Sequence, residues 1–196
     1  MTLKTLIVDR YENYAALSRA ARRNIDYQVV VIRVPDARVV VVAPHGGSIE
    51  FRTSDIARAI AGDIHSLYLF EGTMYDNNRD LHVTSHNFDE PECLQLIGQH
   101  DVVLAIHGCT GSGNAVYVGD LDDAGRQHMA HCLRKAGFDA QLDGHQFPAS
   151  NPKNVCNRGA RGMGIQLELS RPQRDALDVT RFAQTVRHSL ATLPVP

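Results

Sequence analysis

The stretch VVVVAPHGGSIE, residues 39–50, decides the fold. Four successive valines are β-branched and apolar, which is typical of a strand buried on both faces of a parallel sheet. The chain then turns polar at Pro44-His45, two glycines allow a sharp change of direction, and Glu50 follows His45 closely. Because ligands of such sheets bind at the carboxyl ends of the strands, a histidine and a glutamate at this point indicate a functional site.

Length and composition limit the possibilities. The 196 residues are enough for one hydrophobic core, and we expect a single domain over residues 1–196. A net charge of −2 argues against a protein that binds nucleic acid over its whole surface. The 4 cysteines form no CxxC pair, which argues against a zinc finger or a thioredoxin-type site, whereas 10 histidines point to metal or proton chemistry.

The sequence shows no feature of a membrane protein. No apolar run approaches the roughly 18 residues of a membrane span, and the N-terminal residues lack the apolar core of an export signal. We therefore expect no membrane contact and no signal peptide. The expected location is the cytoplasm, from which cell lysis could release the protein.

Strands and helices are expected to alternate along the chain. The expected strands are residues 27–34, 39–43, 65–71, 81–85, 102–107, 115–118 and 164–170. The expected helices are residues 14–22, 56–61, 89–98, 122–136 and 178–193, with Thr53-Ser54-Asp55 as the cap of the second. This pattern predicts an α/β domain of three layers with a mixed, mostly parallel central sheet.

A second segment, VVLAIHGCTG at residues 102–111, repeats the design of the first. A buried strand runs into His107, and a glycine follows at once. If the two strands are parallel, His45 and His107 emerge at the same edge of the sheet. Two imidazoles and the Glu50 carboxylate, with a fourth position open, make a catalytic zinc site. The alternative is that each histidine only caps its strand by a hydrogen bond.

The segment GIQLELS, residues 164–170, alternates cleanly between apolar and polar side chains. Glu168 would then lie inside a half-buried strand, where a carboxylate is costly unless it has a partner or a function. A zinc hydrolase needs a general base beside the metal, and Glu168 suits that role. The alternative is a salt bridge to a nearby arginine.

The loop NPKNVCNRGARGMG, residues 151–164, is basic and contains no acidic residue. Arg158 and Arg161 can each bind a carboxylate through two hydrogen bonds, and Asn157 adds a neutral donor. The loop runs into the strand of Glu168, so it predicts an anionic, carboxylate-bearing substrate. The alternative is a solvated loop without a ligand. Two further side chains are candidates for lining the site: His82 and Tyr117.

Six segments, taken in order, resemble the poly-γ-glutamate hydrolases, a family of bacteriophage and bacterial proteins related to zinc carboxypeptidases in fold. They are APHGGSIE, TSDIARAIAG, LHVTSHNFDEP, AIHGCTG, CNRG and GIQLELS. The resemblance runs from about Tyr14 to Arg174. It implies a zinc-carboxypeptidase-like α/β/α sandwich with a zinc ion held by His45, Glu50 and His107.

The same resemblance implies an activity. Glu168 would activate the zinc-bound water, and the substrate would be the poly-γ-glutamate of bacterial capsules, cut at internal γ-glutamyl amide bonds. Asn157 and Arg158 would bind a substrate carboxylate, by analogy with an Asn-Arg pair of zinc carboxypeptidases that occupies a different place in chain order. Phe51-Arg52 also departs from the Pro-Gly-like turn expected of the family.

Two other functions use the same residues. One is a zinc amidohydrolase that acts on a small N-acyl amino acid, similar to N-formylglutamate. The other is a module without catalytic activity that binds an anion or a carbohydrate and contains a structural metal.

Overall fold

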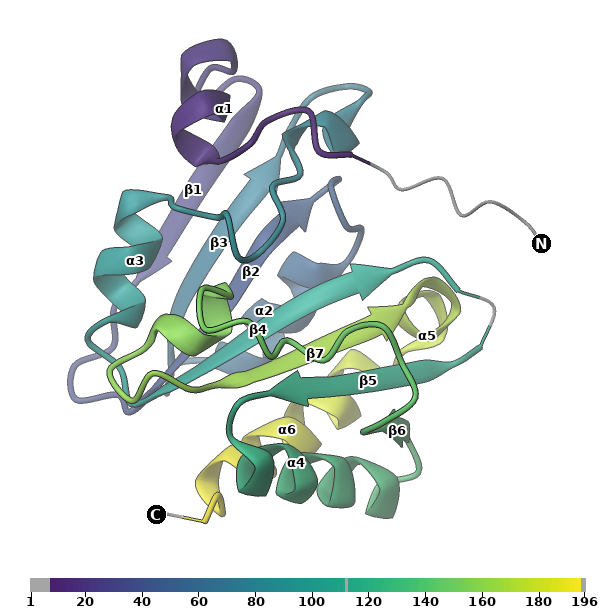
Figure 1. Cartoon of the computed structure of the whole chain (residues 1–196). Helices are drawn as coiled ribbons and strands as arrows, with labels where there is room; N and C mark the ends of the chain where they lie inside the picture. The colour runs from purple at the N-terminus through teal and green to yellow at the C-terminus, as the bar shows by residue number, and fades with distance from the viewer. Residues whose placement is uncertain (1–7, 112, 195–196) are drawn as a thin grey trace.

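The computed structural model describes residues 8–111 and 113–194, and residues 1–7, 112, 195 and 196 lie outside this description. Seven strands form one sheet in the order β1-β3-β2-β4-β7-β5-β6 (Figure 1). The strands are β1 (Tyr27–Ile32), β2 (Val39–Gly47), β3 (Ser66–Gly72), β4 (Val102–Cys109), β5 (Ala115–Asp120), β6 (Asp139–Gln141) and β7 (Ile165–Ser170). Only β1 with β3 and β5 with β7 pair in antiparallel fashion among the described strands. The predicted mixed, mostly parallel sheet is confirmed.

Helices cover both faces of the sheet (Figure 1). One face is packed by α2 (Thr53–Ala61), α4 (Asp123–Lys135) and α6 (Val179–Ala191), and the other by α1 (Tyr14–Ala20), α3 (Pro91–Ile97) and the 3₁₀ helix η2 (Val155–Arg158). The remaining helices are η1 (Asn78–Leu81) and α5 (Arg171–Ala176). The predicted three layers are therefore confirmed. Among the described residues, no helix has the length and apolar character needed to cross a bilayer.

Strand β2 is buried on both faces, as its four valines predict. Val39 and Val41 pack into the core cluster under α2, α4 and α6. Val40 and Val42 pack into the cluster under α1 and α3. Such burial explains why the strand carries no polar residue before its end.

The alternation of β2 breaks near its carboxyl end. Between Ala43 and Gly46 the pairing of β2 with β3 shifts register, and Pro44, which has no N–H to donate, lies in this irregular segment. Strict alternation would turn His45 to the same face as Ala43. Instead the His45 ring bonds to the carbonyl of Val83, a residue of the opposite core cluster. The irregularity therefore aims His45 at the α1 and α3 face.

Two predicted local features are wrong. Residues 81–85 form no strand, because η1 occupies their start, the Thr84 N–H donates to the Asp9 carboxylate and the Ser85 carbonyl accepts from Val155 of η2, instead of pairing with a neighbouring strand. Thr53 is not a cap but the first residue of α2, since its hydroxyl donates to the Glu50 carbonyl at 2.8 Å and the cap position falls on Arg52. The strand β6 and the helix α5 were not predicted, because three and six residues are too short to show a periodic pattern.

Asp9 ties the start of the described chain to the loop after η1. Its carboxylate accepts hydrogen bonds of 2.6 Å from both the N–H and the hydroxyl of Thr84, and it lies 2.6 Å from His82 Nδ1. Burial tends to raise the pKa of Asp9, but the bonds from His82 and Thr84 bring it below the ordinary value. Burial tends to lower the pKa of His82, but its bonds to Asp9 and Glu50 raise it.

We expect Asp9→Asn to lower the free energy of unfolding by about 1–3 kcal/mol at about pH 5, on the order expected for charge-assisted hydrogen bonds. The Asp9 contribution is present above an unfolded pKa of about 3.9 and is lost as the pH falls through the lower folded pKa. The His82 contribution is present below an unfolded pKa of about 6.5 and is lost as the pH rises through the higher folded pKa. The loss should therefore be smaller at about pH 9, measured by urea denaturation of chelator-treated protein.

Asp80→Asn is the matched control for this measurement. Asp80 pairs with Arg10 at 2.5 Å, but the two side chains are 42% and 61% exposed. Its removal should cost clearly less than that of Asp9, because solvent screens the exposed pair, and the cost should have no maximum near pH 5. A cost of Asp9→Asn that does not change with pH would contradict the charged Asp9–His82 pair.

Candidate active site

Three neighbouring parallel strands bring three of the predicted residues together. His45 lies near the end of β2, His107 near the end of β4, and Glu168 near the end of β7. His107 and Glu168 are register partners on adjacent strands. The side chains are buried, with exposed fractions of 2%, 2% and 6%. The carboxyl ends of the strands thus form one buried polar centre.

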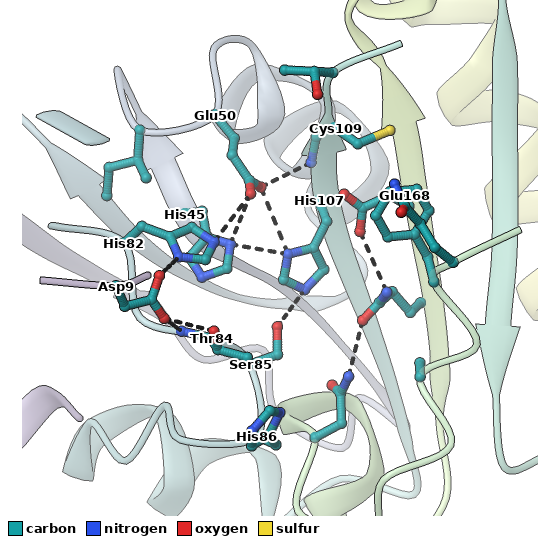
Figure 2. A pocket seen from close by; sticks show the side chains of 18 of the residues that line it. Asp9, His45, Glu50, His82, Thr84, Ser85, His86, His107, Cys109 and Glu168 are labelled. Carbon is teal, nitrogen blue, oxygen red and sulfur yellow. Dashed lines mark hydrogen bonds and ion pairs between the residues drawn. The ribbon is translucent and has the colours of Figure 1, made fainter. Parts of the chain in front are cut away.

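Three imidazoles surround the carboxylate of Glu50 (Figure 2). His45 Nδ1 lies 3.1 Å from Oε1, His82 Nε2 lies 3.5 Å from Oε1, and His107 Nδ1 lies 3.6 Å from Oε2. Glu50 reaches them because the loop after β2 folds back, with the Glu50 N–H donating to the His45 carbonyl at 2.9 Å. The ligand atoms of His45, Glu50 and His82 all lie within 4.8 Å of one another.

The ring nitrogens that face away from Glu50 also have partners. His45 Nε2 lies 2.8 Å from the Val83 carbonyl, and His107 Nε2 lies 3.2 Å from the Ser85 hydroxyl. A carbonyl can only accept, so neutral His45 carries its proton on Nε2 and presents a lone pair at Nδ1. Partners of this kind orient the histidine ligands of metal sites.

The charge states suit metal binding. Burial tends to raise the pKa of Glu50, but the charge and hydrogen bonds of the neighbouring imidazoles hold it well below the ordinary value. Burial and the neighbouring His82 lower the pKa of His45 to about 4, against the opposing effect of Glu50. At neutral pH Glu50 is therefore ionised and His45 neutral, which are the forms that bind metal ions.

The donor atoms fit a zinc ion. His45 Nδ1 presents a lone pair toward a carboxylate oxygen at 3.1 Å and toward His107 Nδ1 at 3.1 Å. Lone pairs that face one another repel unless a positive charge lies between them. Imidazole nitrogen and carboxylate oxygen are common ligands of zinc, and three protein ligands leave a position open for catalysis.

Glu168 lies beside this cluster, with His107 between it and His45 (Figure 2). Burial raises the pKa of the Glu168 carboxyl well above its ordinary value, and the charge of Glu50 adds to this effect. Among the described residues no arginine nitrogen lies within 4.0 Å of Glu168, so the alternative of a salt bridge is not observed. A carboxyl with a raised pKa is suited to proton transfer near neutral pH.

Two buried amides orient Glu168. Gln166 points to the same side of β7 and donates to Glu168 Oε2 at 3.4 Å. Asn154 in turn donates to Gln166 Oε1 at 3.1 Å. The loop of residues 151–164 thus helps to hold the Glu168 carboxyl through Asn154 and Gln166.

The cluster opens into a cleft of about 900 Å³ with a basic wall. Arg79 is half-exposed and lies 3.8 Å from Glu50 Oε1. Arg171 is held by Asp175 at 2.8 Å, and its guanidinium lies 5.0 Å from the centre of the Phe51 ring. These two arginines can reach an anionic ligand in the cleft.

The two arginines predicted for the substrate lie elsewhere. Arg158 donates to the Phe88 carbonyl at 3.0 Å, and Arg161 lies 3.5 Å from Asp122. Neither is among the described residues that line the cleft. Arg79 and Arg171, which do line it, are therefore better candidates for binding a carboxylate.

Asn157 and Tyr117 also lie outside the lining of the cleft. The Asn157 amide is buried and donates to the Ala149 carbonyl at 2.7 Å, so it shapes the loop. Tyr117 packs its ring against Phe147, with centroids 5.4 Å apart. Of the predicted binding residues, His82 alone lies in the cleft among the described residues.

Several residues of the cleft were missed. Arg171 follows the last residue of β7, so the rule that located the histidines at strand ends could have located it. Arg79 lies in the short helix η1, and no local pattern marks it. The position of Ser85 beside His107 depends on the path of a loop without regular structure.

Comparison with known sequences identifies related proteins. The sequence pattern of the family described as poly-gamma-glutamate hydrolase matches residues 11–190. The SPbeta prophage-derived protein YoqZ of Bacillus subtilis (strain 168) is 38% identical over 171 residues, which are 86% of this chain and 61% of YoqZ. The chain therefore spans about three fifths of the length of that relative.

Solved structures are similar over nearly the whole chain. A bacteriophage poly-gamma-glutamate hydrolase has a TM-score of 0.90 and 29% identity, covering 94% of this chain and 97% of that one. A zinc-free apo structure of YndL has a TM-score of 0.89 and 30% identity, covering 96% and 100%. With the family pattern spanning most of its length, this chain belongs to the poly-γ-glutamate hydrolase family.

Proposed function

We propose that this chain is a zinc-dependent hydrolase that cleaves the γ-glutamyl amide bonds of poly-γ-glutamate. Membership of the family supports the substrate class. One observation supports the chemistry above all: two histidines and Glu50 direct metal-binding atoms at one another beside a buried Glu168. Such a site is suited to hydrolysis of an unactivated amide.

His45, Glu50 and His107 would hold the zinc ion. The two histidines lie at the ends of adjacent parallel strands, and both turn Nδ1 toward Glu50. The ring of His82 is tilted against that of His45, with centroids 3.9 Å apart. Its bonds to Asp9 and Glu50 raise its pKa and so favour the protonated form, which does not bind a metal, and we therefore assign it a supporting role. A bound zinc ion supplies Lewis acidity, which lowers the pKa of water toward roughly 7 and polarises a carbonyl.

Glu168 would transfer the proton. The carboxylate accepts a proton from the attacking water as the new C–O bond forms at the γ-carbonyl carbon. The C–N bond then breaks, and Glu168 donates the proton to the leaving α-amine. Gln166 and Asn154 keep the carboxyl in place during both transfers.

The basic wall suits the proposed polymer. Each residue of poly-γ-glutamate keeps a free α-carboxylate, whereas an ordinary peptide backbone offers one only at its end. Arg79 and Arg171 are half-exposed at the cleft, where guanidinium groups can bind carboxylates through paired hydrogen bonds. The cleft thus provides positive charge at more than one place along a bound chain.

Purified protein is expected to shorten poly-γ-glutamate to small oligomers, followed over time by size-exclusion chromatography. A chelator should abolish the change and added zinc should restore it, because the proposed reaction requires the metal ion. An unchanged polymer together with turnover of N-formylglutamate would favour a small N-acyl amino acid as the substrate. No turnover of either would favour a module without catalytic activity.

Glu168→Gln is expected to lower kcat by about 10²- to 10⁴-fold, because it removes a general base and acid. Zinc content, measured by atomic absorption, should stay at the wild-type level. Glu71→Gln is the control, since Glu71 is also a buried strand carboxylate but bonds to Gln28 and Arg58 away from the cleft. Near-normal turnover of Glu168→Gln would remove Glu168 from the mechanism.

The histidines can be separated by metal analysis. His45→Ala and His107→Ala should lose zinc on dialysis, because each removes a ligand. His82→Ala should keep it with about 10- to 100-fold weaker affinity, as expected for a supporting residue. His86→Ala is the control, because His86 lines the same cleft but is exposed and lies apart from the histidine cluster (Figure 2). Complete loss of zinc in His82→Ala, with retention in His107→Ala, would make His82 the metal ligand and His107 the supporting residue.

A further inference from the structure

Arg174 is a buried arginine in the lining of the cleft. It lies near the end of α5 and is 4% exposed. Among the described residues no carboxylate oxygen lies within 4.0 Å of its nitrogens. Burying an arginine in this way is costly, and an apolar residue of similar size is often at least as stable. The guanidinium therefore calls for a reason other than stability.

Its hydrogen-bond partners are three backbone carbonyls. Nε donates to Leu169 at 3.2 Å, Nη2 donates to Cys109 at 3.2 Å, and Nη1 donates to Phe51. These carbonyls come from three different segments of the chain. A planar guanidinium with five donors can join three acceptors at fixed angles, which an ammonium group cannot do.

Each of the three segments carries one residue of the proposed reaction. Phe51 directly follows Glu50, Cys109 comes two residues after His107, and Leu169 directly follows Glu168. A displacement of any of these carbonyls therefore moves a metal ligand or the general base. Arg174 is the point at which the three segments meet.

The packing around Arg174 is adapted to this contact. A Cβ atom on Gly108 would lie 2.5 Å from Arg174 Cζ, so a glycine after His107 leaves room for the guanidinium. Arg52 completes a reciprocal tie, because its guanidinium donates to the carbonyls of Arg174 and Asp175. Arg52 itself has a left-handed backbone with φ of 72°, which a non-glycine residue adopts at some cost.

We propose that Arg174 is a positioning residue that holds the segments of Glu50, His107 and Glu168 in the arrangement needed for metal binding and proton transfer. The inference rests on the proposed function for its effect on turnover. The effect of Arg174 on zinc affinity does not depend on the substrate, so the positioning role of Arg174 and the proposed function can fail separately.

The test compares Arg174→Lys and Arg174→Met with the wild type in two measurements. Zinc affinity, from competition with a chromophoric chelator, is expected to fall about 10-fold or more in both variants, as for other groups that orient metal ligands. With poly-γ-glutamate, kcat should fall by a larger factor than KM changes. Lysine keeps the positive charge, but its single nitrogen cannot reproduce the planar spread of Nε, Nη1 and Nη2 that spans the three carbonyls, so it should not rescue either value.

Arg126→Lys and Arg126→Met are the matched controls. Arg126 in α4 also donates to a backbone carbonyl, that of Leu142 at 3.0 Å, but lies away from the cleft. Both should keep wild-type zinc affinity and kcat. Zinc affinity within twofold of the wild type in both Arg174 variants, or near-normal kcat in Arg174→Lys, would overturn the proposal.

Gly108→Ala provides a test if the Arg174 variants do not fold. The added methyl group displaces the guanidinium while Arg174 remains present. A fall in zinc affinity similar to that expected for Arg174→Lys would support the proposal, and wild-type affinity would contradict it. A wild-type protein that binds zinc but leaves the polymer intact would reject the proposed function and not the role of Arg174 in the metal site.

Discussion

The parallel pairing of β2, β4 and β7 is the constraint on which the site depends. Parallel neighbours end at the same edge of a sheet, so residues more than 60 positions apart in the sequence meet there without any long-range signal of their own. The pairing alone would still leave His45 on the wrong face. The register shift between Ala43 and Gly46 corrects this, and Pro44 suits such a place because it has no N–H for the ladder.

A second feature of the site is that neighbouring groups determine which of its buried carboxyl groups is charged. Glu50 stays ionised in a buried place because three imidazoles surround it, whereas none of these imidazoles pairs with the neighbouring Glu168, and burial raises its pKa. The pKa values of two glutamate side chains in one cleft are thus shifted in opposite directions. Environments that push two pKa values apart are how an active site can give chemically identical side chains different roles in proton transfer.

Much of the site could be predicted because its residues are marked by local pattern. His45 and His107 directly end apolar strands, and Glu168 occupies a polar position in a strand of period two. The arginines carry no such mark. The basic 151–164 loop predicted an anionic substrate, but Arg158 bonds to the Phe88 carbonyl and Arg161 lies beside Asp122. An arginine side chain is long and flexible, so its sequence position says little about which cavity it enters.

The sequence by itself determined most of the strands and helices in their order, the layered class and the family, since these follow from hydrophobic periodicity and from motifs in a fixed order. Only the tertiary structure decided which face His45 takes, that His82 lies beside Glu50, and that Arg174 joins the segments of Phe51, Cys109 and Leu169. The reason is physical. Periodicity records how each segment packs against the core, whereas these contacts depend on a register irregularity and on loops whose paths are set by residues distant in the chain.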